Sequence, residues 1–287
     1  MFRRLTALAA RLAGLDRRWV FAAILLAVAL PFLVPVDFRA APGEHTRRFD
    51  RQLAAMISDP RPLLIGVDFG PQTMAELDPV LLGVLHRVFA ARKRALFLTF
   101  MPEAAAPLRR HLETMERQYD LSYGRDYVFL GYASSFAYTM YGMGKSIRDY
   151  FHKDDRRIPF EELEALEGLR DYGDLAGVVN VASNAMPKFW IQYAVAPFGV
   201  RLLVACTAVQ ATDYYPYLQT GQVGGLLAGG RAGAEYEGML IEAGILDAPG
   251  DAIRGLGSQS LSLLAVLLFI VLGNLGYFAA RHRARRG

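Results

Sequence analysis

Cysteine is nearly absent from this chain: among 287 residues, only Cys206 carries a thiol. One thiol cannot form an internal disulfide, so a disulfide-stapled fold is excluded and a hydrophobic core must hold the domain together. Cys206 stands in an apolar run, LLVACTA, at residues 202–208. We therefore interpret it as a buried thiol and not as a nucleophile.

Metal-ligand clusters and catalytic motifs are missing as well. The histidines of the central region lack the spacing that metal ligands need on one face, and no Gly-x-Ser-x-Gly nucleophile elbow occurs. The segment 142–146 (GMGKS) resembles the end of a phosphate-binding loop, but Thr139 occupies the position where that motif requires glycine. The sequence thus predicts no catalytic residue, no metal site and no cofactor.

Charged residues are missing from two long runs, at residues 19–36 and 261–280. Apolar runs of about 18 to 20 residues match the hydrocarbon thickness of a bilayer. We therefore predict one transmembrane helix near each end, at residues 19–36 and 259–280. The first run is longer than a signal-peptide core, and Phe38 stands where a cleavage site needs a small residue, so we expect a retained anchor.

Positive charge is concentrated at the outer ends of these two runs, and the region between them is acidic. Since basic residues mark the cytoplasmic side of a span, we expect both termini in the cytoplasm of a bacterial inner membrane. The domain of residues 37–258 would then be periplasmic or extracellular. Residues 1–18 have the leucine spacing of an amphipathic helix on the lipid surface, and residues 281–287 form a basic tail. This charge pattern indicates contact with lipid and gives no indication of a nucleic-acid partner.

Five short apolar runs in the central domain alternate with amphipathic stretches. Continuous apolar runs are typical of strands buried on both faces, so we predict a mostly parallel sheet of about five strands in a Rossmann-like α/β fold. The expected strands are residues 63–69, 95–100, 127–132, 177–181 and 201–207, and the expected helices are residues 47–57, 73–91, 103–119, 159–169 and 188–194.

Glycine is abundant in residues 219–244, where Gly221, Gly225, Gly229 and Gly233 recur at every fourth position. On an α-helix such residues form one ridge without side chains, which allows a second helix to approach closely. We interpret the ridge as a surface for self-assembly. Two alternatives stay open: packing against the domain's own sheet, and an irregular loop.

Polar residues stand at or just past the expected strand ends. The carboxyl ends of parallel strands are where α/β folds bind ligands, so these residues are candidates for a ligand crevice, although ordinary caps and turns are the alternative. The candidates are Asp68, Thr99, Tyr132, Asn180, Ser183 and Thr207, with Ser134, Asn184 and Gln210 nearby.

Three segments, at residues 126–132 (DYVFLGY), 189–194 (FWIQYA) and 215–222 (YPYLQTGQ), resemble a group of uncharacterised prokaryotic membrane-anchored proteins. The resemblance covers the central domain. It implies an extracytoplasmic Rossmann-like domain, and it implies neither an activity nor the role of any residue.

Without a nucleophile–base pair or a metal constellation, the sequence favours a non-catalytic, membrane-anchored scaffold or binding module. We expect the module to self-assemble or to belong to a larger membrane complex, so its partners are the lipid bilayer and other membrane-bound subunits. Two alternatives stay open. One is an envelope hydrolase or transferase that uses Asp68 with a strand-end polar group, and the other is an accessory subunit of a transporter.

Overall fold

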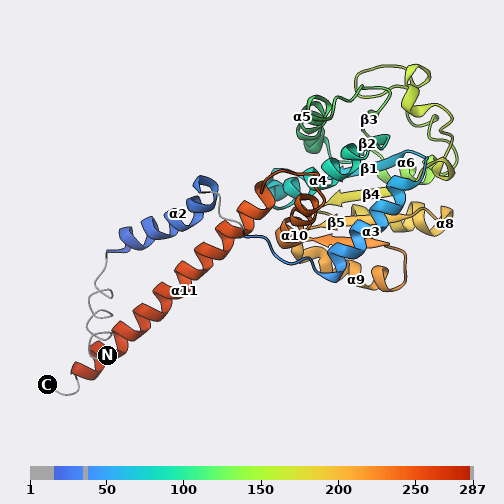
Figure 1. Cartoon of the computed structure of the whole chain (residues 1–287). Coiled ribbons are helices and arrows are strands. Elements are labelled where there is room, and N and C mark those ends of the chain that lie inside the picture. The colour runs from blue at the N-terminus through green and yellow to red at the C-terminus, as the bar shows by residue number, and fades with distance from the viewer. Residues whose placement is uncertain (1–15, 35–37, 285–287) are drawn as a thin grey trace. The chain divides into compact units, whose positions relative to one another are not determined.

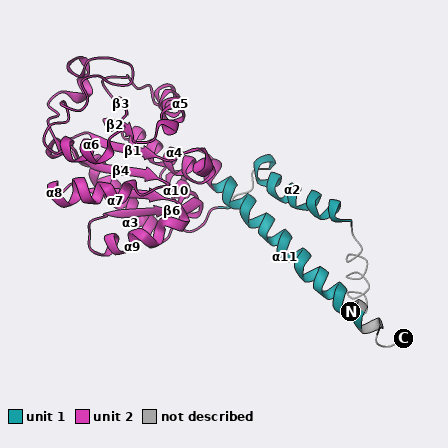
Figure 2. Ribbon diagram, turned by 180° about the vertical axis from the view of Figure 1, so that it is seen from behind, with its two compact units in different colours: residues 1–38, 253–287 teal, residues 39–252 magenta. Residues whose placement is uncertain are grey.

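The computed structural model describes residues 16–34 and 38–284 of the chain. Residues 39–252 form one compact unit, and the chain on either side of them forms a second one (Figure 2). The first of these units contains the whole sheet, and its architecture is the framework for the site described below.

A six-stranded sheet, all parallel, forms the centre of this unit, and the α/β fold with a Rossmann-like sheet is confirmed (Figure 1). The strand order is β3-β2-β1-β4-β5-β6. The chain therefore reverses direction across the sheet between β1 and β4, which is the usual ligand position in such folds. The strands are β1 (Leu63–Asp68), β2 (Ala95–Thr99), β3 (Tyr127–Tyr132), β4 (Gly177–Ala182), β5 (Leu202–Cys206) and β6 (Gly225–Ala228).

Helices cover both faces of the sheet, which explains why the strands are apolar throughout. The first core packs under α3, α4, α5 and α10, and the second under α6, α7 and α9 together with the turns that precede β4. The α-helices of this unit are α3 (Glu44–Ser58), α4 (Met74–Ala90), α5 (Pro102–Tyr119), α6 (Phe136–Met143), α7 (Met186–Trp190), α8 (Ala196–Phe198), α9 (Ala211–Gln219) and α10 (Gly229–Glu242). The shorter turns are η1 (Pro71–Thr73), η2 (Phe160–Glu162), η3 (Glu164–Leu166), η4 (Tyr172–Asp174) and η6 (Ala208–Gln210), and η5 (Ile191–Val195) is a π-helical turn that joins α7 to α8.

The helix predicted at residues 159–169 is wrong, because this segment folds into the 3₁₀ turns η2 and η3. Its large buried apolar residues are Phe160, Leu163, Leu166 and Leu169, which recur at every third position, and Ala165 is buried between them. A spacing of three matches the roughly three residues per turn of a 3₁₀-helix, whereas an α-helix would rotate them progressively away from the core.

The glycine ridge is also corrected, because its four glycines do not share a helix. Gly221 lies in a turn, Gly225 begins β6, and Gly229 and Gly233 belong to α10. A four-residue spacing has no common face once a strand interrupts the helix. The glycines of β6 and α10 instead allow close internal contacts: a Cβ on Gly225 would lie 2.7 Å from Cα of Phe49, and one on Gly233 would lie 2.8 Å from Cγ2 of Val80.

The described part of the chain contains one helix long and apolar enough to cross a bilayer, whereas two were predicted. This helix is α11 (Asp251–Ala284), through its stretch Asp251–Phe278. The first predicted span corresponds to α2 (Arg17–Leu33), whose 17 residues extend about 26 Å, short of a hydrocarbon core of about 30 Å. Residues 35–36 of that predicted span lie outside the described residues, and so do residues 1–15 of the amphipathic segment and residues 285–287 of the tail.

Two buried glutamates on α10 fasten the chain where it begins and ends this unit. The Oε2 atom of Glu235 accepts hydrogen bonds from Gly43 N (2.9 Å) and Thr46 Oγ1 (2.7 Å), at the start of α3. Glu237 accepts hydrogen bonds from Gly250 N and from Ala252 N, at the start of α11. Burial alone would raise the pKa of Glu235, but hydrogen bonds from Gly43, Thr46 and Arg231 hold it below its usual value.

Substitution at Gly225 tests the internal-packing explanation of the glycine-rich segment. We expect Gly225→Ala to lower the free energy of unfolding by about 1 to 3 kcal/mol, because the new Cβ would meet the backbone of Phe49. The control is Gly230→Ala in α10, where no heavy atom lies within 4 Å of the added Cβ. Thermal unfolding of the full chain in detergent, followed by circular dichroism, measures both variants. Equal effects of the two substitutions would contradict this explanation.

Candidate functional site

The carboxylate of Asp68 connects three adjacent strands at the point where the strand order reverses, between β1 and β4. Asp68 is the last residue of β1 and has no exposed surface. Its Oδ1 accepts hydrogen bonds from Phe100 N (2.7 Å) and from Thr99 Oγ1 (3.5 Å), both at the end of β2. Its Oδ2 accepts a hydrogen bond from Asn180 Nδ2 (2.7 Å) on β4. Donors from β2, from the residue that follows it and from β4 thus occupy both oxygens of this carboxylate.

Burial raises the pKa of Asp68 to about 6, although the hydrogen bonds from Phe100, Asn180 and Thr99 oppose the shift. Two more buried polar atoms lie on the same side of β1, namely Asn180 Oδ1 and Trp190 Nε1. Neither has a hydrogen-bond partner among the residues that the structure describes. The absence of a side chain at Gly66 makes room for this group, since a Cβ there would lie 2.9 Å from Asn180 Nδ2 and 3.5 Å from Trp190 Nε1.

The six predicted crevice residues do not form one site. Asp68, Thr99 and Asn180 meet, but all three are fully buried, and Ser183 joins them through its backbone N–H, which donates to the Asp68 carbonyl (3.1 Å). Thr207 follows β5, two strands from β1, and its hydroxyl donates to Gln210 Oε1 (3.2 Å).

Tyr132, the remaining predicted crevice residue, lies at the end of β3, on the other side of β1 from Thr207. Its side chain is 46% exposed and lines a separate pocket.

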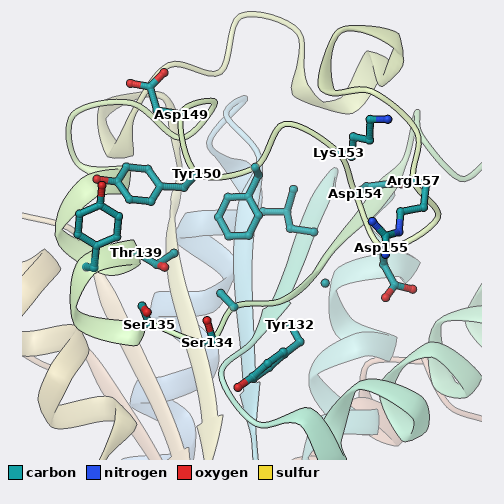
Figure 3. A pocket seen from close by; sticks show the side chains of 15 residues that line it. Tyr132, Ser134, Ser135, Thr139, Asp149, Tyr150, Lys153, Asp154, Asp155 and Arg157 are labelled. Carbon is teal, nitrogen blue, oxygen red and sulfur yellow. The ribbon is translucent and has the colours of Figure 1, made fainter.

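This second site, which we call the β3–α6 pocket, is an open depression of about 600 Å³ at the carboxyl end of β3 (Figure 3). It lies between the end of β3, the first turns of α6 and the loop of residues 149–157. The polar and aromatic residues that line it include Tyr132, Ser134, Ser135, Tyr138, Thr139, Asp149, Tyr150, Lys153, Asp154, Asp155 and Arg157.

An irregularity near the end of β3 shapes the β3–α6 pocket. The pairing between β2 and β3 shifts register between Phe97 and Thr99, and Gly131 has a φ of +97°, which L side chains rarely adopt. Such bulges re-aim the side chains that follow them. Here the loop of residues 149–157 comes close to this bulge: a Cβ on Gly131 would lie 3.7 Å from Cα of Asp155, and Asp155 N donates to the Phe129 carbonyl (2.9 Å).

The hydroxyl groups of the pocket lie at the start of α6. Ser135 is the N-cap residue of this helix, but its side chain makes no capping hydrogen bond. Thr139 is only 6% exposed. Within the described ranges, its hydroxyl has no hydrogen-bond partner, and the hydroxyls of Ser134 and Ser135 have none either. The pocket therefore presents several donors that no protein group satisfies.

The charges around the pocket fall into two groups. Asp155 is neutralised by Arg109, whose Nε and Nη2 donate to its two oxygens at 2.8 and 2.9 Å. Asp154 accepts hydrogen bonds from the Tyr123 hydroxyl and from Ile158 N (2.8 Å). Lys153 and Arg157 form no salt bridge in the part of the chain that the structure describes. Asp154 and Asp155 thus already have hydrogen-bond partners, whereas Lys153, Arg157 and the third acid, Asp149, have no salt bridge among the described residues.

Sequence reasoning found the strand-end residues of the buried group, but it missed most of the β3–α6 pocket. In the sequence, Thr139 stands out only as a mismatch to a phosphate-binding loop, and no motif marks Lys153 or Arg157. The segment 142–146 that resembles that motif lies at the end of α6 and beyond it, where Lys145 Nζ is 4.8 Å from the centre of the Tyr141 ring. Ser134 and Ser135 before a helix were the one available signal, since serine is a preferred N-cap residue.

Comparison with known proteins adds no assignment: no family model, no curated protein and no solved structure matches this chain. The resemblance to prokaryotic membrane-anchored proteins therefore stays a hypothesis, and the function must be argued from the geometry alone.

The raised pKa of Asp68 predicts that the stability of the domain depends on pH. Because the folded-state pKa (about 6) lies above the ordinary value of 3.8, protonation favours the folded state. The contribution is fully present below about pH 4 and is lost as the pH rises through about 6, by about 3 kcal/mol in total. The Asp68→Asn variant cannot titrate, so the difference in unfolding free energy between wild type and variant should change between pH 4.5 and pH 7.5. Parallel pH profiles would show that Asp68 ionises normally.

Proposed function

We propose that this chain is a membrane-anchored, non-catalytic binding module whose ligand site is the β3–α6 pocket. The observation that carries the proposal is the contrast between the two polar sites. The Asp68 group is sealed inside the sheet and satisfies its carboxylate with protein donors. The β3–α6 pocket is open, and the hydroxyls of Ser134, Ser135 and Thr139 that line it have no hydrogen-bond partner among the described residues. Convergent polar groups in an open concavity are typical of small-molecule sites.

Asp68 is the residue on which the hydrolase or transferase alternative depended. A general acid or base must come within hydrogen-bond reach of its substrate, and a side chain with no exposed surface can do so only after the sheet opens. The proposal therefore gives Asp68 a structural role and assigns ligand contact to the pocket.

The proposed function is the binding of a ligand and does not include the self-assembly expected from the sequence. The glycine ridge was the feature that favoured association of several copies, but Gly225, Gly229 and Gly233 pack closely against elements of the same chain, and Gly221 lies in a turn. In α10, moreover, Gly233 packs against α4, which leaves this glycine no free face for a partner helix.

The membrane part of the proposal rests on α11, which is long and apolar enough to span a bilayer, and on the arginines outside the two apolar runs. We propose that both termini are cytoplasmic and that the pocket opens outside the cytoplasm.

Thiol labelling tests this topology. Glu162→Cys places a thiol on an exposed position of the domain, and Gly287→Cys places one at the C-terminus, whereas the natural Cys206 is buried. In spheroplasts, a membrane-impermeant maleimide should label the first variant at once and the second only after permeabilisation. Labelling of both variants to the same extent before permeabilisation would disprove the topology.

Bound small molecules test the pocket itself. The full chain, purified from its native membrane in mild detergent, should carry a non-covalent ligand that native mass spectrometry detects. Ser135→Trp should reduce the occupancy at least about tenfold, because the indole fills the pocket, a loss of more than about 1.4 kcal/mol of binding free energy. The matched control is Ser58→Trp at the exposed end of α3, which should retain the ligand. An unchanged ligand in Ser135→Trp, or no ligand in any of the three proteins, would refute the assignment.

A further inference from the structure

The start of α6 presents unsatisfied backbone donors to the β3–α6 pocket. The first-turn N–H groups of an α-helix have no carbonyl partner within the helix, and they carry the positive end of its dipole. α6 has 8 residues, and no side chain of its N-cap residue Ser135 accepts from these groups. In many proteins such a helix start binds an anion, but an uncapped start is not in itself a binding site.

Thr139 supplies the second observation. Its side chain is 94% buried, since its exposed fraction is 6%. It lines the pocket, and Figure 3 shows it between Tyr150 and Ser135. No group in the described chain accepts from or donates to its hydroxyl, although threonine in a helix usually bonds to the carbonyl four residues earlier. Its oxygen is not among the fully buried side-chain atoms that lack a partner in the described chain, so it keeps contact with the pocket, where a ligand oxygen could accept its hydrogen bond.

The remaining polar groups decide the charge of the ligand. The hydroxyls of Ser134 and Ser135, the start of α6, and the cations Lys153 and Arg157 can all donate hydrogen bonds. The carboxylates of Asp154 and Asp155 are already satisfied by Tyr123 and Arg109. Asp149 and Asp154 form no ion pair among the described residues and could oppose an anion, but Figure 3 shows Asp149 beyond the Tyr150 ring from Ser135 and Thr139, and Asp154 across the pocket from them. The hydroxyls therefore favour a ligand group rich in acceptor oxygens, and the positive end of the α6 dipole favours a negative charge on that group.

We propose that the β3–α6 pocket binds the phosphate group of a phosphate monoester, an inference that rests on the proposed function. A carboxylate offers two acceptor oxygens, whereas a terminal phosphate offers three and carries nearly two negative charges at neutral pH. Three hydroxyls and a helix start match the phosphate better, and Figure 3 shows Lys153 and Arg157 across the pocket from Ser135 and Thr139. The exposed ring of Tyr132 leaves an aromatic surface for the organic part of the ester.

Titration of the purified full chain in detergent tests the phosphate assignment, with three probes that separate the possible sources of the group. Inorganic phosphate probes the anion alone, and glycerol 3-phosphate probes a soluble ester. Nanodiscs of phosphatidylcholine with 10% phosphatidic acid, compared with pure phosphatidylcholine nanodiscs, probe a lipid headgroup. We expect at least one of these phosphate probes to bind, more weakly as the salt concentration rises.

Thr139→Val keeps the shape of the side chain and removes only the hydroxyl, so the fold should stay intact. It should weaken phosphate binding about tenfold, as the loss of one hydrogen bond to a charged group does. The control is Thr114→Val on the exposed face of α5, which should bind like wild type. Equal affinity of Thr139→Val and wild type, or no binding of any phosphate probe by wild type, would overturn the assignment. If no phosphate probe binds while Ser135→Trp still loses the co-purified ligand, the proposed binding function is retained and only the phosphate assignment is rejected.

Discussion

The carboxylate of Asp68 is the interaction on which the arrangement of the sheet depends. It accepts hydrogen bonds from the end of β2 and from β4. These bonds fix the register of three adjacent strands at the place where the strand order reverses. In Rossmann-like folds this place usually opens into the ligand crevice. Here it is filled by protein groups, because a fully buried carboxylate without donors would be strongly unfavourable. The polar groups left for a ligand lie two strands from β1, at the end of the edge strand β3.

The chain that follows β1 also disfavours a phosphate at the reversal point. Dinucleotide-binding folds place glycines there, so that a pyrophosphate can approach the start of the next helix. In this chain β1 is followed by a single glycine, Gly70, and then by Pro71, and Glu76 occupies the first turn of α4, where its Oε1 accepts from Ala208 N (2.8 Å). The first turn of α4 thus already contains an acid, whereas the first turn of α6 contains none. Two helix starts in one fold therefore differ in what they can bind.

The parts of this fold that can be predicted are those that depend on residues close together in the sequence. Five strands could be predicted because burial on both faces makes them continuously apolar, and β6 was missed because its 4 residues (GLLA) stand among glycines that also fit a helix. The group of Asp68, Thr99 and Asn180 could be predicted because strand ends of a parallel sheet converge. The β3–α6 pocket could not, since it requires the loop of residues 149–157 to fold back over β3, through contacts such as Asp155 N to the Phe129 carbonyl.

The pocket and the chain connections lie at opposite edges of the sheet. The pocket lies at the end of β3, which is one edge strand, whereas α10 begins directly after β6, the opposite edge strand. Glu235 and Glu237 of α10 hold the residues where the chain enters and leaves the domain. A ligand at β3 therefore touches neither connection, and any effect on the flanking helices would have to cross the whole sheet. That sheet is buried on both faces, and Asp68 joins its central strands by hydrogen bonds, so we expect it to be stiff. A stiff sheet favours a module that holds a ligand over one that changes conformation when the ligand binds.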